Sequence, residues 1–427
     1  MKEYTKIISE NIFDEYYDYD EDEDLDKIYN FLKNEENFRP FNEGLIELII
    51  KSNDNFKNQE NYDLKVYFDY LKEKLDCINV KIYTQVINDW LTGKHRPKVE
   101  ENYREKMYQI CFALNLELKQ VYDFFNEVYF SRAFNCHSIK EAVYYYCFSN
   151  KFSYKEAQEM IYLIENSKEN TEKNIEIIYT SAIKNKIDTF AKKEHFIEYM
   201  KENKHNFNIW NITSYSKIKE LFDEINTSKE ISKDIRYKIN KNISLTDEDK
   251  NSCGLFLRYQ LLEIEKSDDI KKSFKDMFGK KDITSVKCIL DNLLYSYKIS
   301  SNKNIPYIVK NNFPSEKSFS NILSASNEDF TKFKAYTSKS YDTIRKLLIF
   351  LKFFNFWYKY KLGFMNENDM DILFEAYIQE TNILLNECGY EDFYVGNPYD
   401  WIFFKCAKSD EPITAFENII GYIVDNI

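Results

Sequence analysis

Few residues in this chain could carry out acid–base, nucleophilic or metal chemistry. The histidines are four in number: His95, His137, His195 and His205. Glu202 and His205 form a single Glu-x-x-His step, whereas a di-metal helix bundle needs two such steps and two further carboxylates. Cys136 and His137 are adjacent in sequence, but adjacency does not create the geometry of a nucleophile and its base. Glycine-rich phosphate loops, dinucleotide fingerprints and a Gly-x-Ser-x-Gly turn are all missing. We therefore expect a protein that is not an enzyme and that uses no cofactor and no metal ion.

The scarcity of glycine and proline indicates an all-α fold. The 427 residues include only 8 Gly and 6 Pro. A β-rich fold of this length would need many more of both for hairpins and turns, whereas long helices joined by short polar turns need few. We expect a helix-turn-helix-like bundle near the N-terminus, followed by a larger multi-helix body. No repeat of fixed period is visible, although serial helical hairpins could still stack as a solenoid.

The formal net charge of −12 disfavours a nucleic-acid coat protein and a membrane-surface protein, but it leaves room for a local basic face. No basic segment followed by an apolar run marks a secretory leader. The most apolar tract, 347–358, contains Lys352 and is too short to cross a bilayer, so we expect a buried core helix. The eight cysteines form no Cys-x-x-Cys pair and are expected to be buried free thiols. These features predict a cytoplasmic protein without a membrane partner.

Charge and proline distribution suggest four segments. Nine of the thirteen residues in 14–26 are acidic, so we expect a solvated, flexible arm over 1–27; an alternative is an intramolecular decoy that competes with DNA phosphates. A helix-turn-helix-like domain over 28–130, a helical middle domain over 131–305 and a helical C-terminal domain over 306–427 follow. Pro306 and Pro314 motivate the last boundary. Polar stretches at 202–216, 226–251 and 299–321 are expected to be joints.

Helix starts are marked by capping residues. Ser138 with Glu141 and Ser153 with Glu156 have the spacing of capping boxes, and predict helices over about 139–149 and 154–165. Weaker versions pair Thr246 with Asp249 and Ser326 with Asp329. Asn397 followed by Pro398 is typical of a helix N-cap and first turn. A further helix is expected to begin at Pro412.

One stretch carries a functional signal. Residues 82–116 contain the pieces Val86-Ile87-Asn88-Asp89-Trp90-Leu91, Thr92-Gly93-Lys94-His95-Arg96-Pro97 and Cys111-Phe112-Ala113-Leu114-Asn115-Leu116. These pieces resemble the Cro/cI-like (XRE) helix-turn-helix family. In that family an apolar or aromatic residue ends the recognition helix, a glycine turn with basic residues follows, and the next helix ends in an Ala-Leu pair. The resemblance covers at most a fifth of the chain.

The resemblance implies a scaffolding helix over 64–75, a turn over 76–80 and a recognition helix over 81–91. Leu64, Phe68, Leu71 and Leu75 would form the buried face of the first helix, and Ile82, Val86 and Trp90 that of the second. The outward residues could then read bases, since Gln and Asn pair with adenine and Thr contacts the thymine methyl group. These candidates are Tyr83, Thr84, Gln85 and Asn88, with Asp89 beside them. The candidates for phosphate contacts, which position without specifying sequence, are Lys81, Lys94, His95, Arg96 and Lys98.

Three features depart from the family pattern: a long polar loop at 52–62, a slightly long turn before the recognition helix, and a net charge of only +1 (nine basic minus eight acidic residues) over 61–110. Two functions remain open. One is a DNA-binding transcriptional regulator whose body senses a ligand or dimerises, similar in outline to peptide-sensing regulators with helical-repeat sensor domains. The other is a protein–protein interaction factor of a defence, counter-defence or toxin-control system, with a degenerate helix-turn-helix. The partners would be duplex DNA, another protein or a second copy.

Overall fold

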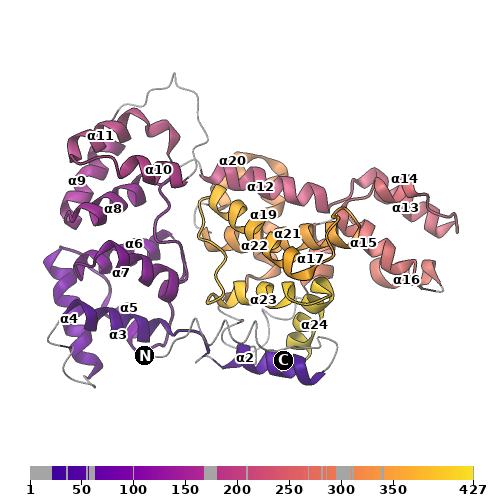
Figure 1. Cartoon of the computed structure of the whole chain (residues 1–427), viewed down its shortest axis with the longest axis horizontal. Coiled ribbons are helices and arrows are strands. Elements are labelled where there is room, and N and C mark those ends of the chain that lie inside the picture. The colour runs from indigo at the N-terminus through magenta and orange to yellow at the C-terminus, as the bar shows by residue number, and fades with distance from the viewer. Residues whose placement is uncertain are drawn as a thin grey trace.

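Every regular element in the described residues is a helix, which confirms the expected all-α class. The computed structural model describes residues 22–34, 37–53, 56, 63–99, 101–167, 180–207, 210–267, 269–279, 282–284, 286–294, 309, 312–337 and 341–426. Their buried apolar residues form two separate cores, so the helices belong to two lobes (Figure 1).

The N-terminal lobe comprises the described residues between 41 and 207, whose core runs from Phe41 to Phe207. Its helices are α3 (Phe41–Ser52), α4 (Leu64–Cys77), α5 (Thr84–Leu91), α6 (Glu101–Ala113), α7 (Leu118–Asp123), the π-helical turn η3 (Phe124–Tyr129), α8 (Ile139–Asn150), α9 (Tyr154–Glu165), α10 (Thr180–Ile187), α11 (Lys193–Glu202) and the short 3-10 helix η4 (Lys204–Asn206). Helices α3 to α6 hold the candidate helix-turn-helix, and α8 to α11 stack above them in Figure 1.

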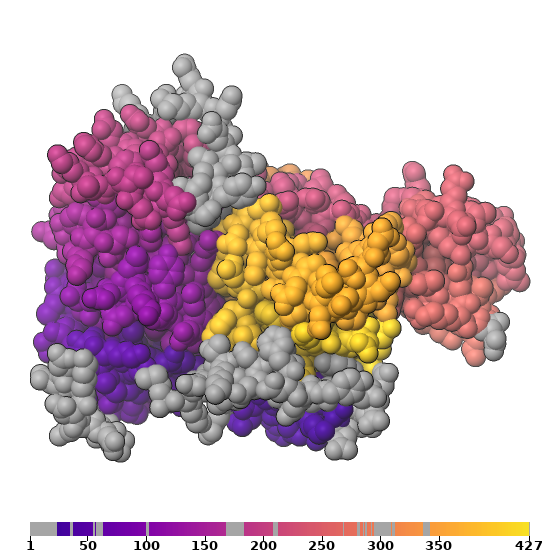
Figure 2. Space-filling view, in the orientation of Figure 1, coloured from indigo at the N-terminus to yellow at the C-terminus, as the bar shows by residue number. Residues whose placement is uncertain are grey.

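The C-terminal lobe comprises the described residues within 22–38 and 210–426, whose core runs from Leu25 to Val424. Its helices are α2 (Asp22–Lys33), α12 (Trp210–Ile225), α13 (Lys229–Asn240), α14 (Asp247–Asn251), α15 (Leu255–Ile264), α16 (Ile270–Phe278), α17 (Val286–Leu294), α19 (Glu316–Glu328), α20 (Phe330–Thr337), α21 (Tyr341–Lys361), α22 (Met370–Glu387), α23 (Pro398–Ala407) and α24 (Pro412–Asp425). Helices α13, α14 and α16 extend away from the rest of this lobe, and we call residues 227–284 the arm (Figures 1 and 2).

The two cores divide the chain differently from the sequence-based boundaries. The described residues on both sides of the expected boundary near 130 share one core, since Val128, Tyr129 and Phe134 pack in the same cluster as the helix-turn-helix helices. The expected boundary between 305 and 306 also lies within one core, since Leu293 and Phe319 pack into the same cluster. Pro314 precedes α19 without separating the apolar surfaces of Leu293 and Phe319, and Pro306 lies outside the described residues.

The acidic arm is shorter than expected. Residues 1–21 lie outside the described residues, but Asp22 already begins helix α2. Leu25, Ile28 and Leu32 on this helix pack into the C-terminal lobe, against α24, instead of joining the helix-turn-helix domain. Carboxylates in a first helical turn are favourable next to the positive end of the helix dipole, so residues 22–26 fold despite their charge.

The expected helix starts are largely confirmed. Ser153 and Glu156 form a complete capping box, as do Thr246 and Asp249, and Ser138 accepts a hydrogen bond from the backbone N–H of Glu141. Asn397 caps α23 with Pro398 in the first turn, and Pro412 begins α24. The Ser326 prediction was wrong: this residue lies buried inside α19, and its hydroxyl donates to the carbonyl of Leu323.

The polar stretch 226–251 is helical where we expected a joint. Helix α13 begins after Ser228, whose hydroxyl accepts from the backbone N–H of Ile231. Ile235 and Ile239 are its buried apolar residues, and lysines occupy much of the remaining surface. So small an apolar face is easily mistaken for a linker by hydrophobicity, although its spacing of four residues is helical.

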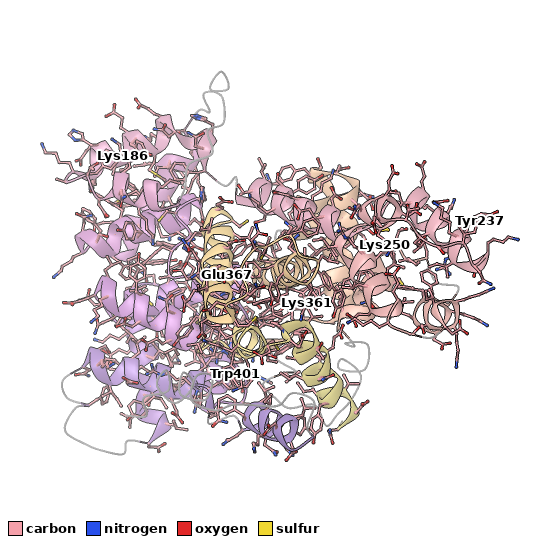
Figure 3. All side chains as sticks on the ribbon, turned by 45° about the vertical axis from the view of Figure 1, so that its right-hand side comes forward. Lys186, Tyr237, Lys250, Lys361, Glu367 and Trp401 are labelled. Carbon is pink, nitrogen blue, oxygen red and sulfur yellow. The ribbon has the colours of Figure 1, made fainter. Side chains whose placement is uncertain are left out.

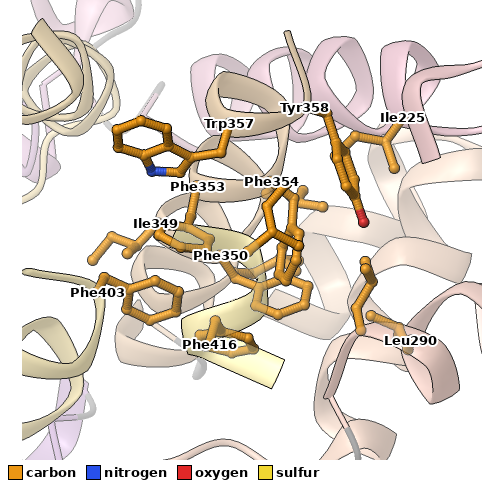
Figure 4. Packing of buried hydrophobic residues seen from close by; sticks show 14 of the residues in the cluster. Ile225, Leu290, Ile349, Phe350, Phe353, Phe354, Trp357, Tyr358, Phe403 and Phe416 are labelled. Carbon is orange, nitrogen blue, oxygen red and sulfur yellow. The ribbon is translucent and has the colours of Figure 1, made fainter. Parts of the chain in front are cut away.

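Helix α21 is the centre of the C-terminal core. From Leu347 to Tyr358 every residue except Lys352 is almost completely buried, as the rings of Phe350, Phe353 and Trp357 in Figure 4 illustrate. The Lys352 ammonium reaches Glu380 of α22 at 2.6 Å. This confirms the expected core helix. Among the described helices, none is both long and apolar enough to cross a membrane.

A buried ion network crosses α21, α23 and the loop before α23. Arg345 donates two hydrogen bonds to Asp400, of 2.8 and 2.6 Å, and both side chains are inaccessible to solvent. The Arg345 Nε atom also lies 2.7 Å from Glu391. Asp400 accepts a further bond from the backbone N–H of Tyr394, so the loop is fixed by the same carboxylate.

The network continues into the N-terminal lobe. Glu391 accepts a 2.9 Å bond from the backbone N–H of Arg132, and the Arg132 guanidinium donates to the carbonyl of Tyr390 at 2.7 Å. Beside this contact, Gly389 has a φ of +80°, and a Cβ there would lie 2.9 Å from the Asn135 side chain. The two lobes thus meet through residues that are about 260 positions apart in sequence.

We expect Asp400→Asn to lower the free energy of unfolding of the C-terminal lobe by about 3–5 kcal/mol, because Arg345 would lose its charged bidentate partner in a buried site. Urea denaturation followed by circular dichroism would measure this. Asp371→Asn is the matched control, since Asp371 is exposed and pairs with Lys408, and it should change stability far less than Asp400→Asn does. Equal effects of the two substitutions would contradict the structural role of the network.

Glu417 on α24 makes the stability of the C-terminal lobe dependent on pH. Burial, followed by the charge of Glu263, raises the pKa of this carboxyl from 4.5 to about 7. A raised pKa favours the protonated form in the folded state, so stability should fall as pH rises from about 4.5 to about 7.

We expect Glu417→Gln to remove this loss. The variant should equal the parent near pH 4.5 and exceed it at pH 8 by on the order of 2 kcal/mol. Thermal or urea unfolding at both pH values would measure the difference. The exposed Glu375→Gln serves as control, and a Glu417→Gln effect that does not change with pH would refute the assignment.

Candidate nucleic-acid interface

Helix α4 provides the scaffold of the candidate helix-turn-helix. Asp63 caps it by accepting a hydrogen bond from the backbone N–H of Lys65. The buried face consists of Tyr67, Leu71 and Leu75. The expected stripe was therefore partly wrong: Leu64 is exposed and Phe68 is half-buried, because the helix is rotated toward Tyr67.

The turn between α4 and α5 is built without glycine. Asn79 has a φ of +57°, and the N–H of Val80 donates to the carbonyl of Leu75 at 3.0 Å while the N–H of Asn79 donates to that of Asp76. This pattern is a Schellman motif, and the buried Val80 and Leu75 supply its usual apolar contact. Asn tolerates the left-handed conformation better than most other residues, which explains how the helix can stop here.

Helix α5 begins at Thr84, three positions later than expected, so Lys81 and Tyr83 lie in the turn. The connection 78–83 is longer than the three or four residues common in helix-turn-helix motifs. The later start also changes the buried face. Ile87, Trp90 and Leu91 are buried, whereas Ile82 and Val86 are only half-buried.

Trp90 anchors α5 in the N-terminal core. It is 2% exposed and packs edge-on against Phe41 of α3, with the ring centroids 6.1 Å apart. After α5, Gly93 adopts a φ of +72° close to the Asn42 side chain. The loop 92–99 therefore starts from a fixed position beside α3.

The base-reading candidates lie on the solvent side of this anchored helix. Tyr83 is 83% exposed, and Thr84, Gln85 and Asn88 are exposed as well. Gln85 and Asn88 are three positions apart, so they share one helix face. The Gln85 amide donates to the Asp89 carboxylate at 2.7 Å, a bond that would have to be exchanged for one to a base.

Four phosphate candidates lie at the two ends of that face. Lys81 is exposed in the turn before α5, and Lys94, His95 and Lys98 are exposed in the loop after it. Lys94 lies 3.8 Å from Asp89. The arrangement places basic groups on both sides of the polar face of α5.

Arg96, the fifth phosphate candidate, has a different environment. Its guanidinium lies over the ring of Phe130, 3.9 Å from the centroid, and donates to the carbonyl of Val128. A longer 3.5 Å contact reaches the carbonyl of Arg39. Through these contacts, the Arg96 side chain joins the 92–99 loop to the C-terminal end of η3.

We expect Arg96→Ala to lower the free energy of unfolding of the N-terminal lobe by roughly 1–3 kcal/mol, since the Val128 carbonyl would lose a charged donor and Phe130 its covering group. Lys94→Ala, which removes an exposed cation from the same loop, should change stability by less than about 0.5 kcal/mol. Urea unfolding followed by tryptophan fluorescence would compare them. An Arg96→Ala variant as stable as the parent would exclude this structural role.

Other candidate chemistry finds no support in the local environments. Burial raises the pKa of the Cys136 thiol to about 12, and burial together with the Arg132 charge lowers the pKa of His137 to about 4. A neutral thiol beside a weakly basic imidazole does not form an activated nucleophile. All eight cysteines are free and all but Cys77 are buried, so the expected buried thiols are confirmed for seven positions. Within the described ranges, no group of three or more His, Cys, Asp or Glu side chains could hold a metal ion.

Comparison of the chain with protein-family models, with curated proteins and with solved structures returns no match. The resemblance to the Cro/cI-like family therefore depends on the quoted residues alone.

Proposed function

We propose that this protein is a transcriptional regulator that binds duplex DNA through α5. One observation carries the proposal: α5 follows α4 through the Schellman turn at Asn79 and is anchored by Trp90 against Phe41 of α3, with Thr84, Gln85 and Asn88 facing solvent. A B-DNA major groove admits one α-helix, and amide side chains can pair with adenine at the N6 and N7 positions. Lys81, Lys94, His95 and Lys98 would meet the phosphates on either side of the groove.

The C-terminal lobe would regulate this contact. It joins the N-terminal lobe through Arg132, Glu391 and Tyr390, in a contact that is continuous with the buried Arg345–Asp400 pair. Ligand binding or dimerisation in the C-terminal lobe that moved the loop 389–394 would also move the attachment of residues 130–135. The position of α5 on DNA, or the spacing of two copies, would change with it.

The proposal predicts that Gln85→Ala combined with Asn88→Ala will lower the affinity for the selected DNA site by roughly 10- to 100-fold, because each lost amide–adenine pair contributes about 1–3 kcal/mol of discrimination. Affinity for random-sequence DNA should change little. Selection from random duplexes at two salt concentrations, followed by sequencing of the retained fraction, would provide the site and the measurement.

The matched control is Gln158→Ala with Asn166→Ala, which removes the same amide types from α9 and its C-cap, away from α5. It should leave both affinities unchanged. Failure of the parent protein to retain any duplex at low salt, with residues 1–21 deleted to remove their negative charge, would refute DNA binding.

A second candidate is a protein–protein interaction factor with a degenerate helix-turn-helix. It is favoured by the near-neutral charge of 61–110, by the engagement of Gln85 with Asp89, and by the internal contacts of Arg96. In that case Tyr83, the most exposed large apolar residue of the N-terminal lobe, would belong to a protein contact. Tyr83→Ala would then weaken capture of a protein partner while the DNA selection enriched no motif.

A further inference from the structure

The arm carries two rows of basic residues on a chain whose net charge is −12. Lys229, Lys233 and Arg236 recur at steps of four and three residues, so they form one row along α13. Lys271 and Lys275 form a second row along α16, four residues apart. We call these five residues the basic stripe.

Contacts between the helices show that the two rows are neighbours. The Arg236 guanidinium donates to the carbonyl of Gly279 at 2.6 Å, and the Lys271 ammonium donates to the carbonyl of Asn240 at 3.0 Å. The C-terminal end of α13 therefore lies beside the N-terminal end of α16, and the rows run antiparallel. Arg236 also covers the ring of Phe274, which ties the stripe to the core of the arm.

The carboxylates of the arm compensate other lysines. Lys238, on the opposite side of α13 from the stripe, pairs with Asp234 and Asp249 at 2.8 and 2.6 Å. Lys250 pairs with Glu265, and Lys266 with Glu263. Within the described residues, no ion pair involves the four lysines of the stripe, all of which are exposed.

Among the described residues, Asp282 lies close enough to the stripe for their charges to interact. The charges of Lys229 and Arg236 contribute to the lowered pKa of Asp282, after its hydrogen bonds to Thr284. Glu230 lies three positions before Lys233 and therefore also borders the row on α13, whereas Asp276 is turned by about 100–140° around α16 from Lys275 and Lys271. Among the described residues, the five cations of the stripe outnumber the two carboxylates that border it, Asp282 and Glu230, so the stripe is positive.

We propose that the basic stripe binds the phosphate backbone of duplex DNA, independently of base recognition by α5. Its composition favours a nucleic acid over a protein, because lysine is depleted in protein interfaces, whose centres are apolar. Phosphates, in contrast, are contacted mainly by Lys and Arg without regard to sequence. The arm projects from the C-terminal lobe on the side away from α5, so the stripe forms a second contact region and would lengthen or bend the bound duplex (Figures 1 and 2).

The test compares the salt dependence of binding to a random-sequence duplex. The stripe variant changes Lys229, Lys233, Lys271 and Lys275 to Gln in the full chain. The matched control changes four exposed lysines elsewhere to Gln: Lys155, Lys219, Lys317 and Lys334. Each phosphate contact contributes about 0.9 to the slope of log K against log salt, so the stripe variant should lose up to about 3.6 from the slope. The control should lose much less, and circular dichroism would establish that both are folded.

The outcomes separate this inference from the proposed function. Equal slopes for the stripe variant and the control would overturn it, even if Gln85 and Asn88 prove to read bases. A reduced slope with no selected motif would support the stripe and leave base reading by α5 refuted. Repeating the comparison after deletion of residues 1–21 excludes an acidic protein segment as the partner. If the stripe variant differs from the parent only when those residues are present, the stripe binds the acidic segment and the DNA proposal fails.

Discussion

The pairing of Arg345 with Asp400 is the interaction on which the arrangement of the two lobes depends. An arginine and an aspartate without solvent contact are stable only if almost every donor and acceptor is satisfied. Here the carboxylate also holds the N–H of Tyr394, and the guanidinium donates to the carbonyl of Asp392 as well, so the loop between α22 and α23 has one conformation. That conformation presents Glu391 and Tyr390 to Arg132. The position of α5 relative to the C-terminal lobe is therefore set, through a chain of polar contacts, by a charge pair inside the C-terminal core.

Local rules recovered much of the fold. The helix starts at Ser153 and Asn397 follow from capping residues whose hydrogen bonds reach only two or three positions ahead. The core helix around Trp357 follows from an apolar tract too short for a bilayer. Glycine scarcity indicated helices, and the structure shows how they end without it: Asn79, Asn115 and Asn242 adopt the left-handed conformation at helix C-termini. Asn is favoured in the left-handed conformation just after a helix. It also occurs at many positions that do not end a helix, so these helix ends could not be located from the sequence.

The candidate site was predictable in composition but not in geometry. The sequence places Thr84, Gln85 and Asn88 on an outward face, yet α5 starts later than the 82–86–90 spacing suggests, and Ile87 replaces Val86 in the core. Arg96 has the same local context as Lys94, and only the tertiary position of Phe130 and Val128 distinguishes it as internal. The lobe boundaries and the basic stripe were missed for the same reason, since both depend on which distant segments pack together. The row of Lys229, Lys233 and Arg236 was visible as a spacing, but only the structure shows which lysines of the arm form ion pairs, such as Lys238 with Asp234 and Asp249.

The location of α2 has a consequence for synthesis on the ribosome. Phe31 of this helix stacks on Trp401, with ring centroids 4.7 Å apart, and Tyr29 packs against Tyr422 of α24 (Trp401 is labelled in Figure 3). These partners emerge almost 400 residues after α2, and domains generally fold in the order in which they are translated. The N-terminal lobe can thus form while α2 still lacks its binding surface, and the apolar side of α2 stays exposed until the last helix is complete. Translation is therefore the period in which this protein is most vulnerable to aggregation, and a chaperone that covers α2 would protect it then.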